Sequence, residues 1–90
     1  MLDSIRLSLR LVSNDFDSEI LELIEACKRD LAVGGVSNID EKVNEIEPLI
    51  LRAVTLYCKG HFGFANMGEK YLEAYESLKV ALYMEGLTNV

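Results

Sequence analysis

The sequence predicts an all-α fold, a small bundle of about four helices. Apolar residues recur at intervals of three and four along most of the chain, which is the spacing of a helix with one buried face. Hydrophobic residues make up 50% of the sequence and there is only one proline, a composition typical of a folded chain rather than a disordered one. Ninety residues suffice for one domain at most, so residues 1–90 are expected to form a single domain.

The first expected helix spans about residues 2–10. Residues 5–11 alternate between apolar and polar types, as they would in a strand, but Leu2, Ile5 and Leu9 also share one helical face. No second strand-like run follows that could pair with a strand. We therefore expect a short helix here.

The clearest helical pattern lies between a polar break at residues 13–17 and the pair Gly34-Gly35. We expect Asp15 or Asp17 to cap its first turn, because a carboxylate can accept the free amide hydrogens there. The glycine pair should end the helix, because glycine adopts the left-handed conformation without strain. The residues expected in the core from this helix are Ile20, Ile24, Cys27 and Leu31.

Residues 48–62 predict the central helix of the bundle, with Pro48 as its first residue. Only Arg52 and Lys59 interrupt its apolar surface with a full charge, so other helices should enclose it. A turn or two of helix is expected within residues 36–47, and a loose tail at residues 86–90.

An amphipathic C-terminal helix is expected over about residues 69–85. Its acidic side should face solvent rather than form a metal or acid site. The expected buried side carries Tyr71, Tyr75, Leu78 and Leu82, and the exposed side carries Glu69, Glu73 and Glu76.

The charge balance limits the function. Nine basic against 15 acidic residues give a net charge of −6, and an acidic surface repels phosphate, so sequence-specific DNA binding is not expected. No apolar run approaches the roughly 20 residues of a membrane span, and the first residues lack the regions of a signal peptide. We therefore expect a chain made in a cytoplasm, with Cys27 and Cys58 as reduced thiols rather than a disulfide.

Few residues here suggest chemistry. His61, the one histidine, follows Cys58 by about one helical turn, but no third orienting group is near, so we favour inert packing over a thiol–imidazole pair. Zinc ligands would need closer spacing. Gly60, Gly63 and Gly68 match no phosphate-binding loop, and we expect Gly60 to allow close helix approach and Gly63 to allow a turn. We expect no catalytic, cofactor-binding or metal residues and no enzyme activity.

Aromatic side chains gather in the same region. Phe62 and Phe64, beside Tyr71 and Tyr75, could be interpreted as a platform for stacking bases. Because few basic residues lie nearby, we favour packing in the core or at an interface.

Residues 59–66, KGHFGFAN, and residues 74–79, AYESLK, closely resemble the phage head–tail connector family, also known as phage DNA-packaging proteins. The likeness covers nearly the whole chain. It departs from the commonest pattern at Met67, where proline is frequent, and at Gly68. The motif residues, which are expected to have structural roles, are Lys59, His61, Phe62, Gly63, Phe64, Asn66, Tyr75, Glu76, Ser77, Leu78 and Lys79.

The resemblance implies a structural virion protein at the neck between head and tail, present in the host cytoplasm during assembly. Members form rings, expected to be dodecameric, that dock beneath the portal, help to complete DNA packaging and join the tail, and line the DNA exit path. The implied partners are further copies of the chain, the portal protein, tail-side or head-completion proteins, and passing genome DNA without sequence recognition; no membrane and no cofactor are implied. The alternative is a small helical protein-binding or regulatory module of a mobile element.

Overall fold

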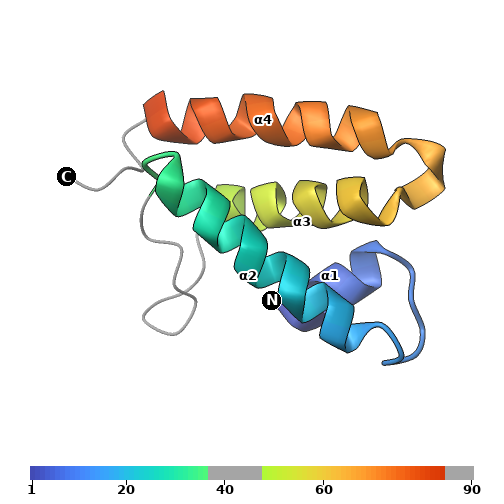
Figure 1. Ribbon diagram of the computed structural model, residues 1–90. Coiled ribbons are helices and arrows are strands. Elements are labelled where there is room, and N and C mark those ends of the chain that lie inside the picture. Colours follow the sequence, from blue (N-terminus) through green and yellow to red (C-terminus); the bar gives the residue numbers. More distant parts are fainter. Residues whose placement is uncertain (37–47, 85–90) are drawn as a thin grey trace.

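The computed structural model describes residues 1–36 and 48–84, and this part of the chain is an all-α bundle, as predicted (Figure 1). The expected turns within residues 37–47 and the expected loose tail at residues 86–90 lie outside the described residues. The elements in order are α1 (Leu2–Ser8), α2 (Asp17–Val33), α3 (Pro48–Phe62), the 3-10 turn η1 (Phe64–Asn66) and α4 (Gly68–Met84).

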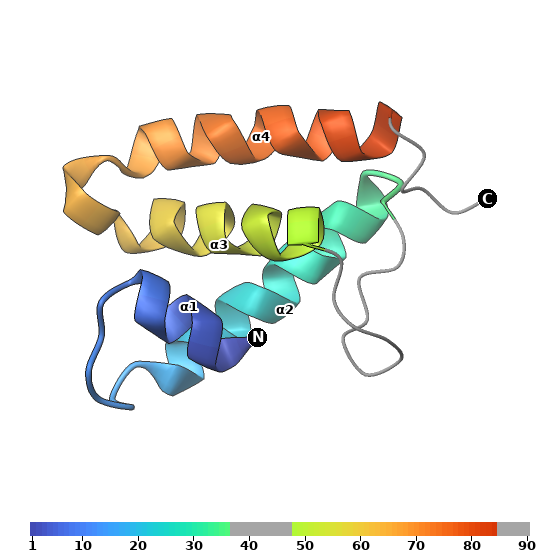
Figure 2. The same ribbon diagram turned by 180° about the vertical axis from the view of Figure 1, so that it is seen from behind.

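Helix α3 is the centre of the bundle. It contacts α1, α2 and α4, whereas α4 packs mainly on α3. Helices α3 and α4 run antiparallel side by side, and α2 crosses α3 obliquely (Figure 1). Figure 2, seen from behind, shows the α3–α4 pair in front of α2. The central position predicted for residues 48–62 is therefore confirmed.

The core draws on all four α-helices. Ile5 of α1 is fully buried, and all four core residues predicted for α2 are buried. On α4 only Tyr75 and Leu82 are buried, while Tyr71 and Leu78 are half-buried. The buried residues of α3 are Ile50, Ala53, Val54, Thr55, Leu56, Cys58 and Gly60.

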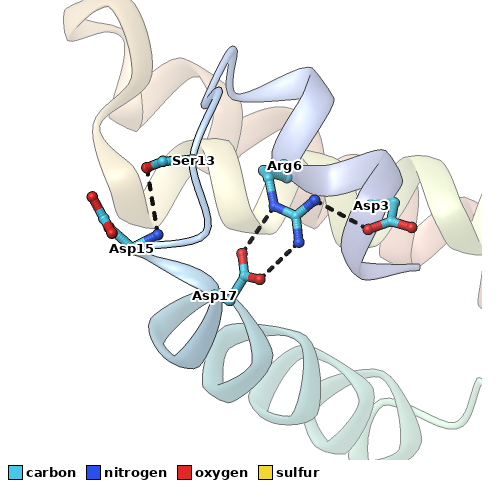
Figure 3. A network of polar contacts seen from close by, with 5 residues as sticks. All are labelled: Asp3, Arg6, Ser13, Asp15 and Asp17. Atoms are coloured by element: carbon cyan, nitrogen blue, oxygen red, sulfur yellow. Dashed lines mark hydrogen bonds and ion pairs between the residues drawn. The ribbon is translucent and has the colours of Figure 1, made fainter.

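Arg6 fastens α1 to the beginning of α2 (Figure 3). Its Nε and Nη2 donate hydrogen bonds to the two carboxylate oxygens of Asp17 at 2.9 and 2.7 Å, the bidentate geometry that suits a guanidinium and a carboxylate. Nη1 contacts Asp3 at 3.1 Å. The hydrogen bonds from Arg6 lower the pKa of the Asp17 carboxyl.

This pairing explains why the predicted cap of α2 is wrong. The N-cap position is Phe16, and no side chain caps the helix there. Asp17 is the first helical residue and its carboxylate is bound to Arg6 instead. The backbone N–H of Asp15 donates to the hydroxyl of Ser13 at 3.4 Å, so Asp15 belongs to the preceding turn (Figure 3).

Glycine ends α2 as predicted. Gly35 has a φ of 92°, in the left-handed region, and the N–H of Val36 reaches back to the carbonyl of Leu31 at 2.9 Å. A Cβ at Gly35 would also press against the ring of Tyr83, so this turn brings the end of α2 against the end of α4.

Of the described helices, none has the length and apolarity needed to cross a bilayer.

Replacing Leu56 with alanine should destabilise the protein by about 2–5 kcal/mol, because the side chain is only 5% exposed and its loss leaves a cavity. Glu73→Ala, on the exposed side of α4, should change the free energy of unfolding by no more than about 0.5 kcal/mol. Urea unfolding monitored by circular dichroism measures both. Equal effects would contradict the burial described here.

Candidate functional site: the α3–α4 hairpin

The connection between α3 and α4 is a tight turn with three residues in the left-handed region. Gly63 has a φ of 64°, Ala65 of 55° and Asn66 of 59°. The N–H of Asn66 donates to the carbonyl of Gly63, and that of Met67 to Phe64, both at 3.0 Å. The turn predicted at Gly63 is confirmed. At Ala65 the conformation costs about 1–2 kcal/mol, so the surrounding contacts must hold it.

Glycines allow the two helices to meet closely beside this turn. A Cβ at Gly60 would collide with the side chain of Leu72, and one at Gly68 would lie 2.9 Å from the carbonyl oxygen of Gly60. The close approach predicted for Gly60 is therefore confirmed, and Gly68 is explained by the same contact. Met67 has a φ of −119° and uses its N–H in the turn, so proline, with φ near −65° and no N–H, would not fit here.

Lys59 joins three successive elements. Its ammonium lies 5.1 Å from the ring centre of Phe64 and 5.3 Å from that of Tyr71, within the range of cation–π attraction. On another side of the turn, the ring of Phe62 meets that of Phe16 edge-on at 6.1 Å. The aromatic residues of the hairpin thus pack against one another, a cation and the segment before α2, as the packing interpretation predicted.

A polar network ties α4 to α2. Tyr75 is 1% exposed, and its hydroxyl donates to Oδ2 of Asp30 at 2.5 Å. Nζ of Lys79 donates to the same oxygen at 3.0 Å and also pairs with Glu76. The hydrogen bond from Tyr75, followed by those from Lys79, lowers the pKa of Asp30, while burial raises the pKa of Tyr75. The network therefore links the two helices, in addition to the packing of Tyr83 beside Gly35.

His61 and Cys58 lie in different surroundings. His61 is exposed and packs against Tyr57, with ring centres 4.3 Å apart and ring planes inclined by 47°. Tyr57 in turn meets Tyr75 edge-on, with ring centres 5.1 Å apart. Cys58 is fully buried, and burial raises the pKa of its thiol to about 12. Burial likewise raises the pKa of Cys27 to about 12. Within residues 1–36 and 48–84, no group of three or more His, Cys, Asp or Glu side chains could hold a metal ion.

Residues 1–87 match the family model described as phage connector protein. The chain belongs to this family. The match runs from α1 through α4 and includes the whole hairpin, so the resemblance noted in the sequence is confirmed, and it supports a head–tail connector role. Curated proteins and solved structures gave no match.

The structure divides the connector motif into groups. The turn group consists of Lys59, Phe62, Gly63, Phe64 and Asn66. The network group consists of Tyr75, Glu76 and Lys79. Leu78 is half-buried against the core, while His61 and Ser77 are exposed.

Sequence reasoning missed two partners of the connector motif. Asp30 binds both Tyr75 and Lys79, and Tyr57 lies between Tyr75 and His61. A partner for Asp30 could have been expected from the sequence, because Asp30 directly precedes the core residue Leu31 and a carboxylate near the core needs a partner. For Tyr57 the sequence held no comparable signal.

The substitution Asp30→Asn should make the free energy of unfolding less dependent on pH in the acidic range. The pKa of Asp30 is lower in the folded protein than in the unfolded chain. As the pH falls, the carboxylate is therefore protonated in the unfolded chain before it is protonated in the folded protein. The stabilisation that the Asp30 carboxylate provides is lost as the pH falls through its pKa in the folded protein. The variant should therefore unfold more easily than the wild type at pH 7, and the difference should shrink below the ordinary pKa of 3.8. Urea titrations from pH 7 to about pH 2 measure this.

Glu73→Gln, at an exposed position, is the matched control and should follow the wild-type pH profile. The role of the carboxylate would be contradicted if the difference in free energy of unfolding between the wild type and Asp30→Asn stayed the same down to about pH 2.

Proposed function

We propose that this connector is a ring-forming adaptor at the head–tail junction, docked beneath the portal and joined to tail-side or head-completion proteins. The observation that carries the proposal is the family match over residues 1–87. The site in this case is a structural hairpin, whose backbone closes the turn and whose side chains tie α4 to α2. The ring lines the path along which genome DNA leaves, and it helps to complete DNA packaging and to join the tail.

Exposed apolar side chains support self-association. Leu7 is 79% exposed and Met84 is 76% exposed, and contact with another subunit would remove such apolar side chains from water. The other large apolar side chains with more than two fifths of their surface exposed are Val12, Phe16, Leu21, Val33, Leu49, Met67, Val80 and Tyr83. Together with Leu7 and Met84 they are spread over the four α-helices and the segments between them, so a subunit with neighbours on two sides would cover part of this surface.

The net charge of −6 supports a passive relation to DNA. Phosphate is repelled by a surface rich in carboxylates, so genome DNA could slide past the ring without adhering. An inner wall lined mainly by lysine and arginine would contradict this part of the proposal.

Deleting the gene from the phage or prophage that carries it tests the role. We expect heads and tails to accumulate separately, and the gene supplied in trans to restore complete virions, with the protein located at the neck in cryo-electron micrographs. Normal yields of complete virions from the deletion would overturn the proposal. Sedimentation velocity of the purified chain, alone and with portal protein, tests the ring and its subunit number.

We propose further that the role is non-catalytic. Both thiols are buried with raised pKa values, and thiolate is the reactive form. Cys58 should therefore resist a mild alkylating reagent in the folded protein and react fully in urea, as mass spectrometry of the labelled peptides would measure. Rapid labelling of Cys58 under native conditions would reopen the thiol-enzyme hypothesis.

A further inference from the structure

The turn that reverses the chain between α3 and α4 is short and strained. It consists of residues 63–67, in which Ala65 has a φ of 55° and Asn66 a φ of 59°. Asparagine tolerates this left-handed conformation better than alanine does, so the strain lies mainly at Ala65. Ala65 is exposed, so burial of its side chain does not offset the strain. The hairpin is therefore closed at a local cost that an open hairpin would not carry.

The surfaces on which α4 packs are matched to it in detail. Gly60 and Gly68 let α3 and α4 approach where a Cβ would collide. Helix α4 also binds α2, because Tyr75 and Lys79 donate hydrogen bonds to the same oxygen of Asp30. The α4 of a second copy carries the same side chains at the same spacing. The site that α4 occupies is thus complementary to α4 of any copy, whichever chain supplies the helix.

We propose that copies of this protein exchange α4, so that α4 of one subunit packs on α3 and α2 of the next. The inference rests on the proposed ring and names the contact that builds it. Short hinge loops under strain favour this kind of exchange. Every contact of α4 with α2 and α3 is kept in the exchanged form, whereas the strain of the closed turn is lost.

Exchange in one direction gives each subunit two neighbours. A subunit supplies its α4 to one neighbour and receives α4 from the other. Such head-to-tail contacts close into a ring when the rotation between subunits permits. The five residues of the hinge reach at most about 18 Å, so the exchanging subunits must lie directly side by side.

The concentration of subunits decides between the closed and the exchanged form. In a single chain α4 has its own α3 beside it, and binding within one chain is favoured by a high effective concentration. Exchange gains as copies are gathered, because association depends on their concentration. A surface that collects several copies, which is the part proposed for the portal, would therefore promote the exchange.

Cross-linking of isotope-labelled mixtures tests the exchange. A zero-length carbodiimide joins Lys79 of α4 to Asp30 of α2, whose side-chain atoms lie 3.0 Å apart. Unlabelled chains and chains labelled with a heavy nitrogen isotope are unfolded together in urea, refolded at high concentration and cross-linked. In the oligomer, mass spectrometry should find linked peptides with one labelled and one unlabelled partner. Unmixed pairs alone in the oligomer would overturn the inference, and the dilute monomer should contain only unmixed pairs.

Substitutions at Ala65 test the role of the strain. Ala65→Gly relieves the closed turn, so it should weaken self-association at least about fivefold, as sedimentation equilibrium would measure. Ala65→Val adds strain, because a β-branched residue fits the left-handed region poorly, and it should strengthen association by about the same factor. Equal association of these two variants would overturn the inference.

Ala74→Gly, at an exposed position within α4, is the matched control. It weakens the helix in the closed and the exchanged form alike, so association should stay within about twofold of the wild type. Circular dichroism confirms that each variant is folded.

The outcomes separate this inference from the proposed function. If the wild type forms rings, alone or with the portal, and the linked pairs are unmixed, the exchange is wrong and the ring stands. If mixed pairs form but deletion of the gene leaves virion yields normal, the exchange stands and the proposed function fails. If the wild type stays monomeric, a folded Ala65→Val that also stays monomeric overturns the inference, since the added strain should open the hairpin.

Discussion

Because nearly every side of α3 is apolar, this helix cannot remain stable in water, and its enclosure governs the position of everything else. Seven of its fifteen residues are buried. Helix α2 covers one side, α4 another, and α1 completes the contact near the end that meets the turn. The polar side chains that remain on α3, chiefly Arg52 and Lys59, mark the side that the described helices do not cover. The outer surface of the protein is thus set by how its central helix is enclosed.

The position of helix α4 depends on a few specific contacts with α3 and α2. Only Tyr75 and Leu82 of its residues are buried, and two features hold it in place. Gly60 and Gly68 let it lie close to α3, and Asp30 binds it to α2 through Tyr75 and Lys79. With so little of α4 used in the core, most of its circumference is free to contact other molecules, which is consistent with a protein whose role is to join larger parts.

The sequence was sufficient for the fold because the helices carry strong local signals. Periodicity predicted the buried residues of α2, proline marked the first residue of α3, and glycine marked the end of α2 and the hairpin turn. The cap of α2 could not be predicted in the same way, since the carboxylate of Asp17 is bound by Arg6, a residue on another helix. The hydrogen bond between Tyr75 and Asp30 could not be predicted either, because it joins residues 45 apart in the chain. Local pattern reveals local structure, whereas a pair between distant residues requires the packed arrangement.

The hairpin also bears on when the chain folds relative to when it meets a partner. Its contacts join α3 and α4, which are neighbours along the chain, and helical bundles dominated by such local contacts fold within microseconds to milliseconds. Association of subunits is slower and depends on concentration. A newly made chain should therefore be folded before it meets a partner, with the whole exposed surface of α4 already formed.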